Sequence, residues 1–230
     1  MAIHESEFDI ARSSRIPKLI EDLFKNMPEI ESDRAVLVTE SYKETEGMPV
    51  ITRRAKALSH ILRHLPITIR DQELIVGSAT KAPRGCQTFP EYSCSWLEDE
   101  FDTVATRSAD PFYISEDTKK QLREAYPYWK GKTNSELASA YMDDQAKKMI
   151  DHNVFTPGNY FYNGVGHICV HYDRVIAVGY EGILKEVREE LAGCNVADGN
   201  YQTKGHFLEA VIESLEAVIA YAKRYAKLAQ

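Results

Sequence analysis

The sequence has few cysteines, and their spacing fits neither a disulfide framework nor a metal site. Four cysteines are scattered over 230 residues without a CxxC pair. In a chain of this length, such scatter indicates free thiols in a reducing, cytoplasmic compartment. The polar N-terminal segment lacks the apolar core of a signal peptide, and no run approaches the ~18 apolar residues of a membrane span. We therefore expect a soluble, cytoplasmic protein with no membrane partner.

The sequence also lacks an excess of positive charge. It contains 28 Lys and Arg against 35 Asp and Glu, which gives a net charge of −7. Surfaces that bind nucleic acid need clustered basic residues, so no nucleic-acid partner is expected. Hydrophobic residues make up 43% and charged residues 27% of the chain, the mixture of an ordinary globular protein.

The hydrophobic pattern predicts a protein built mainly from helices. Apolar residues recur at helical spacing over 15–27, between Ser32 and Gly47, and over 51–65. Pro28 should end the first helix, and Ser32 should cap the second. Further helices are predicted at about 95–105, 115–125, 133–150, 173–192 and 204–228. The run TNSE at 133–136 predicts a capping box.

Residues 66–92 break this helical pattern. They form a long segment with Gly, Pro and Ser punctuation and one β-rich run, ELIVG at 73–77, which predicts a short strand. Irregular segments of this length are usually functional or held by a partner surface. The last predicted helix has no Gly, Asn or Pro to end it, so we expect it to belong to a larger fold.

The most unusual stretch is TPGNYFYNGVGHICV at 156–170. Gly164 and Gly166 precede His167 and remove side chains from its surroundings, which would let a ligand or backbone approach it. Imidazole, with an ordinary pKa near 6.5, is the natural proton donor or acceptor at neutral pH. A histidine that packs in a core and makes a structural hydrogen bond is the simpler interpretation, and the residues alone leave both open.

Other candidate sites have simpler explanations. His171 lies four residues after His167, but in an extended segment the two would be ~13 Å apart, too far to share a metal ion. The pattern at 164–166 lacks the strand, helix and GK[ST] of a phosphate loop. We expect Cys86 and Cys94 to be small packed thiols. The acidic residues at 98–102 should form a solvated helix face, and the aromatic residues at 160–162 should pack in the core.

Five ordered blocks change this assessment. They read RAVLVTESYKETEGMPVITRRAKAL (34–58), LPITIRDQELIVGSATKAPRGCQTFPEY (65–92), DPFYISEDTK (110–119), YWKGKTNSELA (128–138) and FTPGNYFYNGVGHICVHYDRV (155–175). Together they resemble the N-terminal region of the glycyl radical enzymes, the pyruvate formate-lyase-like (PFL) family. The resemblance runs from about residue 15 to 228 and is strongest to the B12-independent glycerol and propane-1,2-diol dehydratases.

The resemblance implies a fold. That family builds a ten-stranded α/β barrel wrapped by helices. This chain would be its N-terminal portion, mainly α with minor β and too short to close the barrel. Residues 1–14 would be a flexible N-terminus, and 15–230 a PFL domain truncated before the thiyl-cysteine and glycyl-radical regions. Because unclosed strands expose their edges, we expect the isolated chain to aggregate or to need a partner.

The resemblance also implies a reaction, a radical elimination of water from a diol to give an aldehyde. The family uses a protein glycyl radical, installed by an S-adenosylmethionine-dependent iron–sulfur activating enzyme, and this chain itself would bind no cofactor. His167 matches the pocket histidine that protonates the leaving hydroxyl. The expected partners are a small diol, the activating enzyme, the remaining C-terminal polypeptide and, in the complete enzyme, a second copy in a homodimer.

Two alternatives remain. The chain could belong to another glycyl radical lyase or a formate acetyltransferase-like enzyme, because the residues that select substrate lie mostly beyond it. It could also be a non-catalytic scaffold that has kept the family's surface. In either case the absence of the radical residues predicts that this chain alone has no activity.

Overall fold

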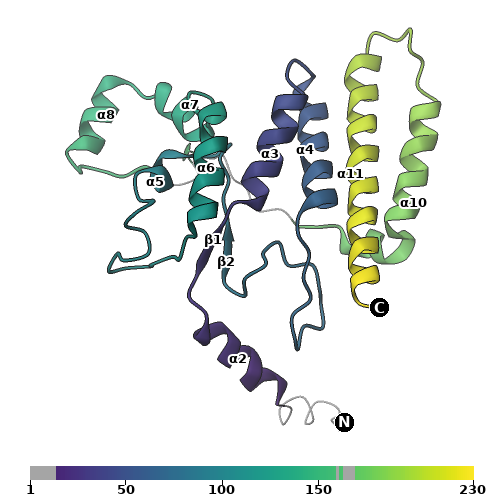
Figure 1. The fold of residues 1–230 in the computed structure, drawn as a ribbon. Coiled ribbons are helices and arrows are strands. Elements are labelled where there is room, and N and C mark those ends of the chain that lie inside the picture. The colour runs from purple at the N-terminus through teal and green to yellow at the C-terminus, as the bar shows by residue number, and fades with distance from the viewer. Residues whose placement is uncertain (1–13, 159–160, 163–168) are drawn as a thin grey trace, which may run out of the picture.

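The structure is a computed structural model that describes residues 14–158, 161–162 and 169–230. It is mostly helical, as expected, and Figure 1 shows two groups of helices on either side of a short strand pair. The elements are α2 (Arg15–Lys25), β1 (Glu29–Glu31), α3 (Asp33–Glu44), α4 (Val50–His64), β2 (Gly85–Gln87), α5 (Ser95–Glu98), α6 (Glu116–Trp129), α7 (Asn134–Ala140), α8 (Asp144–Asp151), α10 (Tyr172–Ala192) and α11 (Tyr201–Leu228).

The main core lies where β1, α3, α5 and α6 meet. Its fully buried side chains include Ile30, Leu97, Leu122 and Tyr126. Trp129 joins α6 to α3, because its indole N–H donates to the Thr39 hydroxyl at 2.7 Å. This buried hydrogen bond satisfies the polar atom of a large apolar side chain, which is what allows Trp to pack in a core.

A second layer is formed by α4, α11 and α10, which lie side by side in Figure 1. Arg224 of α11 donates from its two terminal nitrogens to the carbonyl oxygens of Leu62 and Leu65, each at 2.6 Å. These carbonyls end α4 and carry the partial negative charge of a helix C-terminus. The guanidinium therefore completes the end of α4 and fixes α11 beside it.

Several predicted helices have different ends or packing. Ser32 does precede α3, but its hydroxyl bonds to the Gln121 side chain and does not cap the helix. The helix predicted at 95–105 is only four residues long, α5, and continues as turns. The region 133–150 forms two helices, α7 and α8. The Ser32 difference comes from a tertiary contact, whereas α8 begins at a local cap in which the Asp143 side chain accepts from the Ala146 N–H.

The strand predicted at ELIVG is wrong. Leu74 and Ile75 are 77% and 92% exposed and belong to no strand. The strand of this segment is β2, which pairs in parallel with β1 in the register Glu29–Gly85, Ile30–Cys86 and Glu31–Gln87. The preference of β-branched residues for strands reflects packing on a half-buried surface. ELIVG has no such surface among the described residues.

The capping box at TNSE is confirmed. The Thr133 hydroxyl accepts from the Glu136 N–H at 3.1 Å, and a Glu136 carboxylate oxygen accepts from the Thr133 N–H at 3.2 Å and from the Gly131 N–H at 3.0 Å. Thr133 is buried. The Thr133 hydroxyl donates a hydrogen bond to the Glu136 carboxylate, and this bond is the main reason why the pKa of Glu136 is lowered.

We predict that Thr133→Ala lowers the free energy of unfolding by about 1 kcal/mol, because it removes the N-cap hydroxyl. Urea unfolding at neutral pH measures the change. The pKa of Glu136 is lower in the folded state than in the unfolded state. The ionised carboxylate therefore stabilises the fold above the unfolded pKa, and this stabilisation is lost as pH falls through the folded pKa. The difference in free energy of unfolding between the wild type and Thr133→Ala should therefore become smaller at acidic pH.

Ser139→Ala is the matched control. The Ser139 hydroxyl lies in the same helix and only donates back to the carbonyl of Ser135. If Ser139→Ala were as destabilising as Thr133→Ala, the capping box would not be the source of the effect.

Candidate functional site

His167, the catalytic residue predicted from the resemblance, lies outside the described residues, as does Tyr160. Of the surrounding stretch, Phe161 and Tyr162 are described, with their rings edge-to-face at 5.3 Å. Phe161 is about half exposed, so the prediction that the aromatic run packs in the core is wrong for this residue. His171 is exposed and precedes α10 without a side-chain capping bond.

The acidic run at 98–102, which begins at the last residue of α5, is a solvated, ion-paired face. Glu98 lies 2.9 Å from Lys130, Glu100 lies 2.7 Å from Arg107, and Asp102 lies 3.1 Å from Lys119. Surface pairs of this kind contribute little to stability. Within the described ranges, no group of three or more His, Cys, Asp or Glu could hold a metal ion. No helix of those ranges is long and apolar enough to cross a bilayer.

The two cysteines of the N-terminal half are packed thiols. Cys94 is buried, and burial raises its pKa to about 12. Burial also raises the pKa of Cys86, with a further contribution from the charge of Glu31. A reactive cysteine needs a lowered pKa, because the thiolate is the nucleophile. These thiols are therefore poor ionic nucleophiles at neutral pH.

No sequence pattern predicted the buried carboxylate of Glu31. Glu31, in β1, is only 4% exposed. One of its carboxylate oxygens accepts from the Ala82 N–H at 2.8 Å, and the other accepts from the Lys81 N–H and the Gln87 side-chain amide, each at 3.1 Å. A buried carboxylate is tolerated only when hydrogen bonds replace its water. Here the replacement comes mostly from the backbone of the irregular segment.

Arg70 holds the same backbone through its carbonyl groups. One terminal nitrogen donates to the carbonyl oxygens of Thr80 at 2.6 Å, Lys81 at 3.2 Å and Ala82 at 2.8 Å. The other donates to Glu73 at 2.9 Å. We call Glu31, Arg70 and the backbone of 80–82 the Glu31–Arg70 clamp. Both carboxylate oxygens of Glu31 are occupied by donors, so this carboxylate positions the chain and is not free to act as an acid or base.

Gly85 is required for the clamp to close. A Cβ atom at this position would lie 2.5 Å from the Thr80 Cβ and 2.7 Å from a carboxylate oxygen of Glu31. Both distances are far below van der Waals contact. The absence of a side chain at Gly85 therefore brings β2 against the segment that Glu31 and Arg70 hold.

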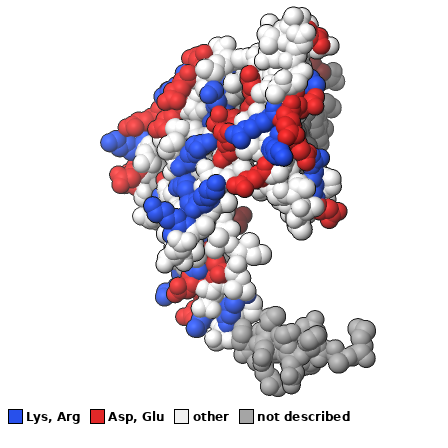
Figure 2. Space-filling model, turned by 90° about the vertical axis from the view of Figure 1, so that its right-hand side faces the viewer, with Lys and Arg blue, Asp and Glu red and all other residues white. Residues whose placement is uncertain are grey.

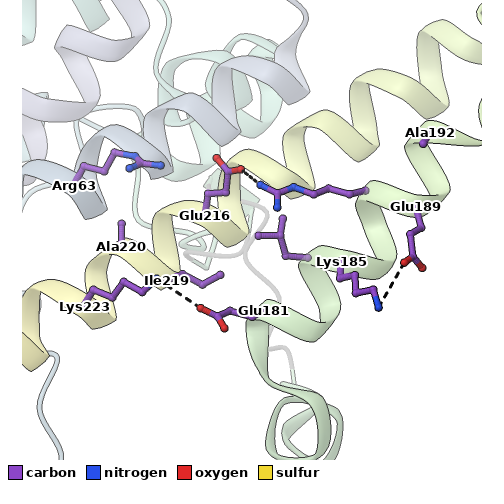
Figure 3. A pocket seen from close by; sticks show the side chains of 11 residues that line it. Arg63, Glu181, Lys185, Glu189, Ala192, Glu216, Ile219, Ala220 and Lys223 are labelled. Atoms are coloured by element: carbon purple, nitrogen blue, oxygen red, sulfur yellow. Dashed lines mark hydrogen bonds and ion pairs between the residues drawn. The ribbon is translucent and has the colours of Figure 1, made fainter.

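One hollow of the second layer lies between α10 and α11 and has a volume of about 670 Å³. Figure 3 shows long charged side chains around it, with Arg63 entering from α4. Each of its carboxylates has a basic partner, because Glu216 pairs with Arg188 at 2.6 Å, Glu181 with Lys223 at 3.6 Å and Glu189 with Lys185 at 3.8 Å. Figure 2 shows this mixture of charges on the same side of the molecule. The hollow is a solvated groove between helices.

Comparison with known proteins identifies the family. The family model "Pyruvate formate lyase-like" matches residues 8–230, so the chain belongs to that family. The (2S)-3-sulfopropanediol dehydratase of Klebsiella oxytoca is 33% identical over 221 residues, which are 94% of this chain and 27% of that protein. The chain therefore spans about a quarter of the length of the relatives that it matches.

Two solved structures are more similar. A structure on 1,2-propanediol dehydration in Roseburia inulinivorans is 59% identical with a TM-score of 0.87, over 94% of this chain and 27% of that one. The glycerol-bound B12-independent glycerol dehydratase of Clostridium butyricum is 51% identical with a TM-score of 0.86, over 94% and 28%. The resemblance to glycyl radical dehydratases is confirmed.

We predict that Gly85→Ala lowers the free energy of unfolding by about 1–3 kcal/mol, since the new methyl group overlaps Thr80 and Glu31. Urea unfolding followed by circular dichroism measures it. Gly199→Ala is the control, because a Cβ there meets nothing within 4 Å. Equal stability of the two variants would contradict the clamp as described.

Proposed function

We propose that this chain is the N-terminal part of a B12-independent glycyl radical diol dehydratase that converts glycerol or propane-1,2-diol to an aldehyde and water. The observation that carries the proposal is the difference in identity among relatives. The chain is 59% identical to the structure on 1,2-propanediol dehydration and 51% identical to the glycerol dehydratase, but 33% identical to the sulfopropanediol dehydratase.

The proposed division of labour follows from what the chain contains. The protein glycyl radical and its thiyl cysteine, on polypeptide beyond this chain, would supply the abstraction of a substrate hydrogen atom. None of the four cysteines stands in the family's thiyl motif, and Cys86 and Cys94 are packed thiols. This chain would supply an acid, because the carbon–oxygen bond next to the activated carbon must break and hydroxide is a poor leaving group.

His167 is the residue that we assign to this step. Its imidazolium would donate a proton to the departing hydroxyl oxygen, so that the fragment leaves as water. A positioned general acid accelerates a reaction by about 10²–10⁴-fold. Exclusion of water from the completed site would strengthen the hydrogen bond that positions the hydroxyl.

The short strands support an incomplete barrel. Among the described residues, β1 and β2 are three residues long and form one parallel pair, with a single further bridge from Glu29 to Tyr113. A pair this small buries little and is not stable by itself. We propose that it is part of one side of a barrel, that residues 15–230 fold as one unit, and that the remaining polypeptide closes the barrel.

We predict that the purified chain alone produces no aldehyde from glycerol or propane-1,2-diol after anaerobic treatment with the radical-activating enzyme. Addition of the remaining C-terminal polypeptide should restore turnover, because it brings the hydrogen-abstracting sulfur. Colorimetric detection of the aldehyde measures both results. A radical-bearing mixture of the two polypeptides that does not turn over either diol would contradict the proposed function.

In the assembled enzyme, we predict that His167→Gln lowers kcat by about 10²-fold or more, because glutamine cannot donate a proton to the leaving oxygen. His152→Gln is the control, since His152 is an exposed residue at the end of α8. Normal turnover by the His167 variant would exclude the assigned role.

A further inference from the structure

Helix α10 is two helices joined at a sharp corner. Gly179 has φ +66° and ψ 171°, a backbone conformation open essentially to glycine alone. It divides α10 into residues 172–178 and residues 180–192. The second part contains Leu184, the buried residue of α10, and lies alongside α11 (Figure 1). The corner changes the direction of the chain before this packing begins.

Residues 172–178, which we call the arm, expose apolar side chains. Tyr172 is 65% and Ile176 is 81% exposed, and Val178 is also exposed. No residue of the arm is buried. Tyr172 and Ile176 are four residues apart, so they lie on the same face of the helix. Grouped apolar side chains of this kind mark a surface that contacts another molecule or segment.

The arm has no reason to be stable as an isolated helix. Helices shorter than about 12 residues are marginal in water, and most helical stability in proteins comes from packing of an apolar face. An ion pair of Arg174 with Glu186 spans the corner and holds the arm from within the chain. It can fix the direction of the arm, but it leaves the apolar face uncovered.

We propose that the arm is a docking surface for the polypeptide that completes the enzyme, and that the corner at Gly179 turns it outward to meet that polypeptide. This inference rests on the proposed function. The relatives are nearly four times as long as the region that this chain matches, so under the proposed function the remaining polypeptide would offer a large partner surface. The arm also begins five residues after His167, which must meet the radical chemistry of the same polypeptide.

The backbone conformation at position 179 can be tested separately from the space available for a side chain there. A Cβ atom at this position would meet nothing within 4 Å, so an L-alanine would be opposed by backbone conformation alone. D-Alanine has the mirrored preference and adopts this φ readily. The corner should therefore accept D-alanine and reject L-alanine.

The first experiment measures assembly by co-expression. The 230-residue chain is produced together with the part of the Clostridium butyricum glycerol dehydratase that lies C-terminal to the matched region. Complex formation is followed by size-exclusion chromatography and titration calorimetry. We expect Ile176→Ser to raise Kd by about tenfold or more, because the side chain loses the burial that docking provides. Ile176→Ser should leave urea unfolding of the chain alone unchanged, since Ile176 is exposed there.

Val196→Ser is the matched control. Val196 is β-branched, 74% exposed and located in the connection between α10 and α11, away from the arm. This variant should bind as the wild type does. Equal binding by Ile176→Ser and wild type would overturn the proposal, and so would failure of the wild-type chain to form a complex. A dimer of the chain alone that Ile176→Ser dissociates would assign the arm to a second copy instead.

The second experiment replaces Gly179 by L- or D-alanine. Segment 169–193 begins with Cys169 and is followed by Cys194, so chemical ligation at these cysteines can introduce either residue. L-Alanine should weaken the complex about tenfold or more, and D-alanine should retain it. Equal affinities would overturn the role of the corner.

Binding is measured without radical or substrate, so the two proposals fail separately. A complex that forms and gives no aldehyde after activation contradicts only the proposed function. If the assembled wild-type enzyme turns over the diol and the Ile176→Ser variant binds as the wild type does, only the proposal of a docking surface is contradicted.

Discussion

The carboxylate of Glu31 and the guanidinium of Arg70 hold the irregular segment 66–92 against the helical core. The Glu31 carboxylate accepts hydrogen bonds from the N–H groups of residues 81–82, and the Arg70 guanidinium donates to the carbonyl groups of residues 80–82. A buried charge is costly unless it is hydrogen-bonded, so the two side chains and this backbone are stable only together. The short strand pair, and with it the position of β1 in the core, depends on this clamp.

The molecule combines a well-packed part with segments whose apolar side chains are exposed. The core around Ile30, Leu97 and Tyr126 is closed, and Arg224 fixes α11 on the end of α4. By contrast, the apolar side chains of 74–76 and of the arm are exposed. The chain spans about a quarter of the length of the relatives that it matches.

The sequence predicted the features that depend on neighbouring residues. Helical periodicity located most of the helices, and TNSE identified the capping box because all of its atoms lie within four residues. The strand prediction at ELIVG was wrong, and the buried role of Glu31 was not predicted because its hydrogen-bond partners lie about 50 positions away. Nothing local separates Glu31 from exposed glutamates. Physical reasoning alone left His167 undecided between a structural and a catalytic role, and the resemblance of five sequence blocks made it the candidate acid.

A crystal structure of the assembled enzyme with glycerol or propane-1,2-diol bound would test the central claim most directly. The proposed role predicts an imidazole nitrogen of His167 within hydrogen-bond reach, about 2.6–3.2 Å, of the hydroxyl oxygen that leaves. An imidazole turned away from the diol, with another side chain as the donor to that oxygen, would contradict it.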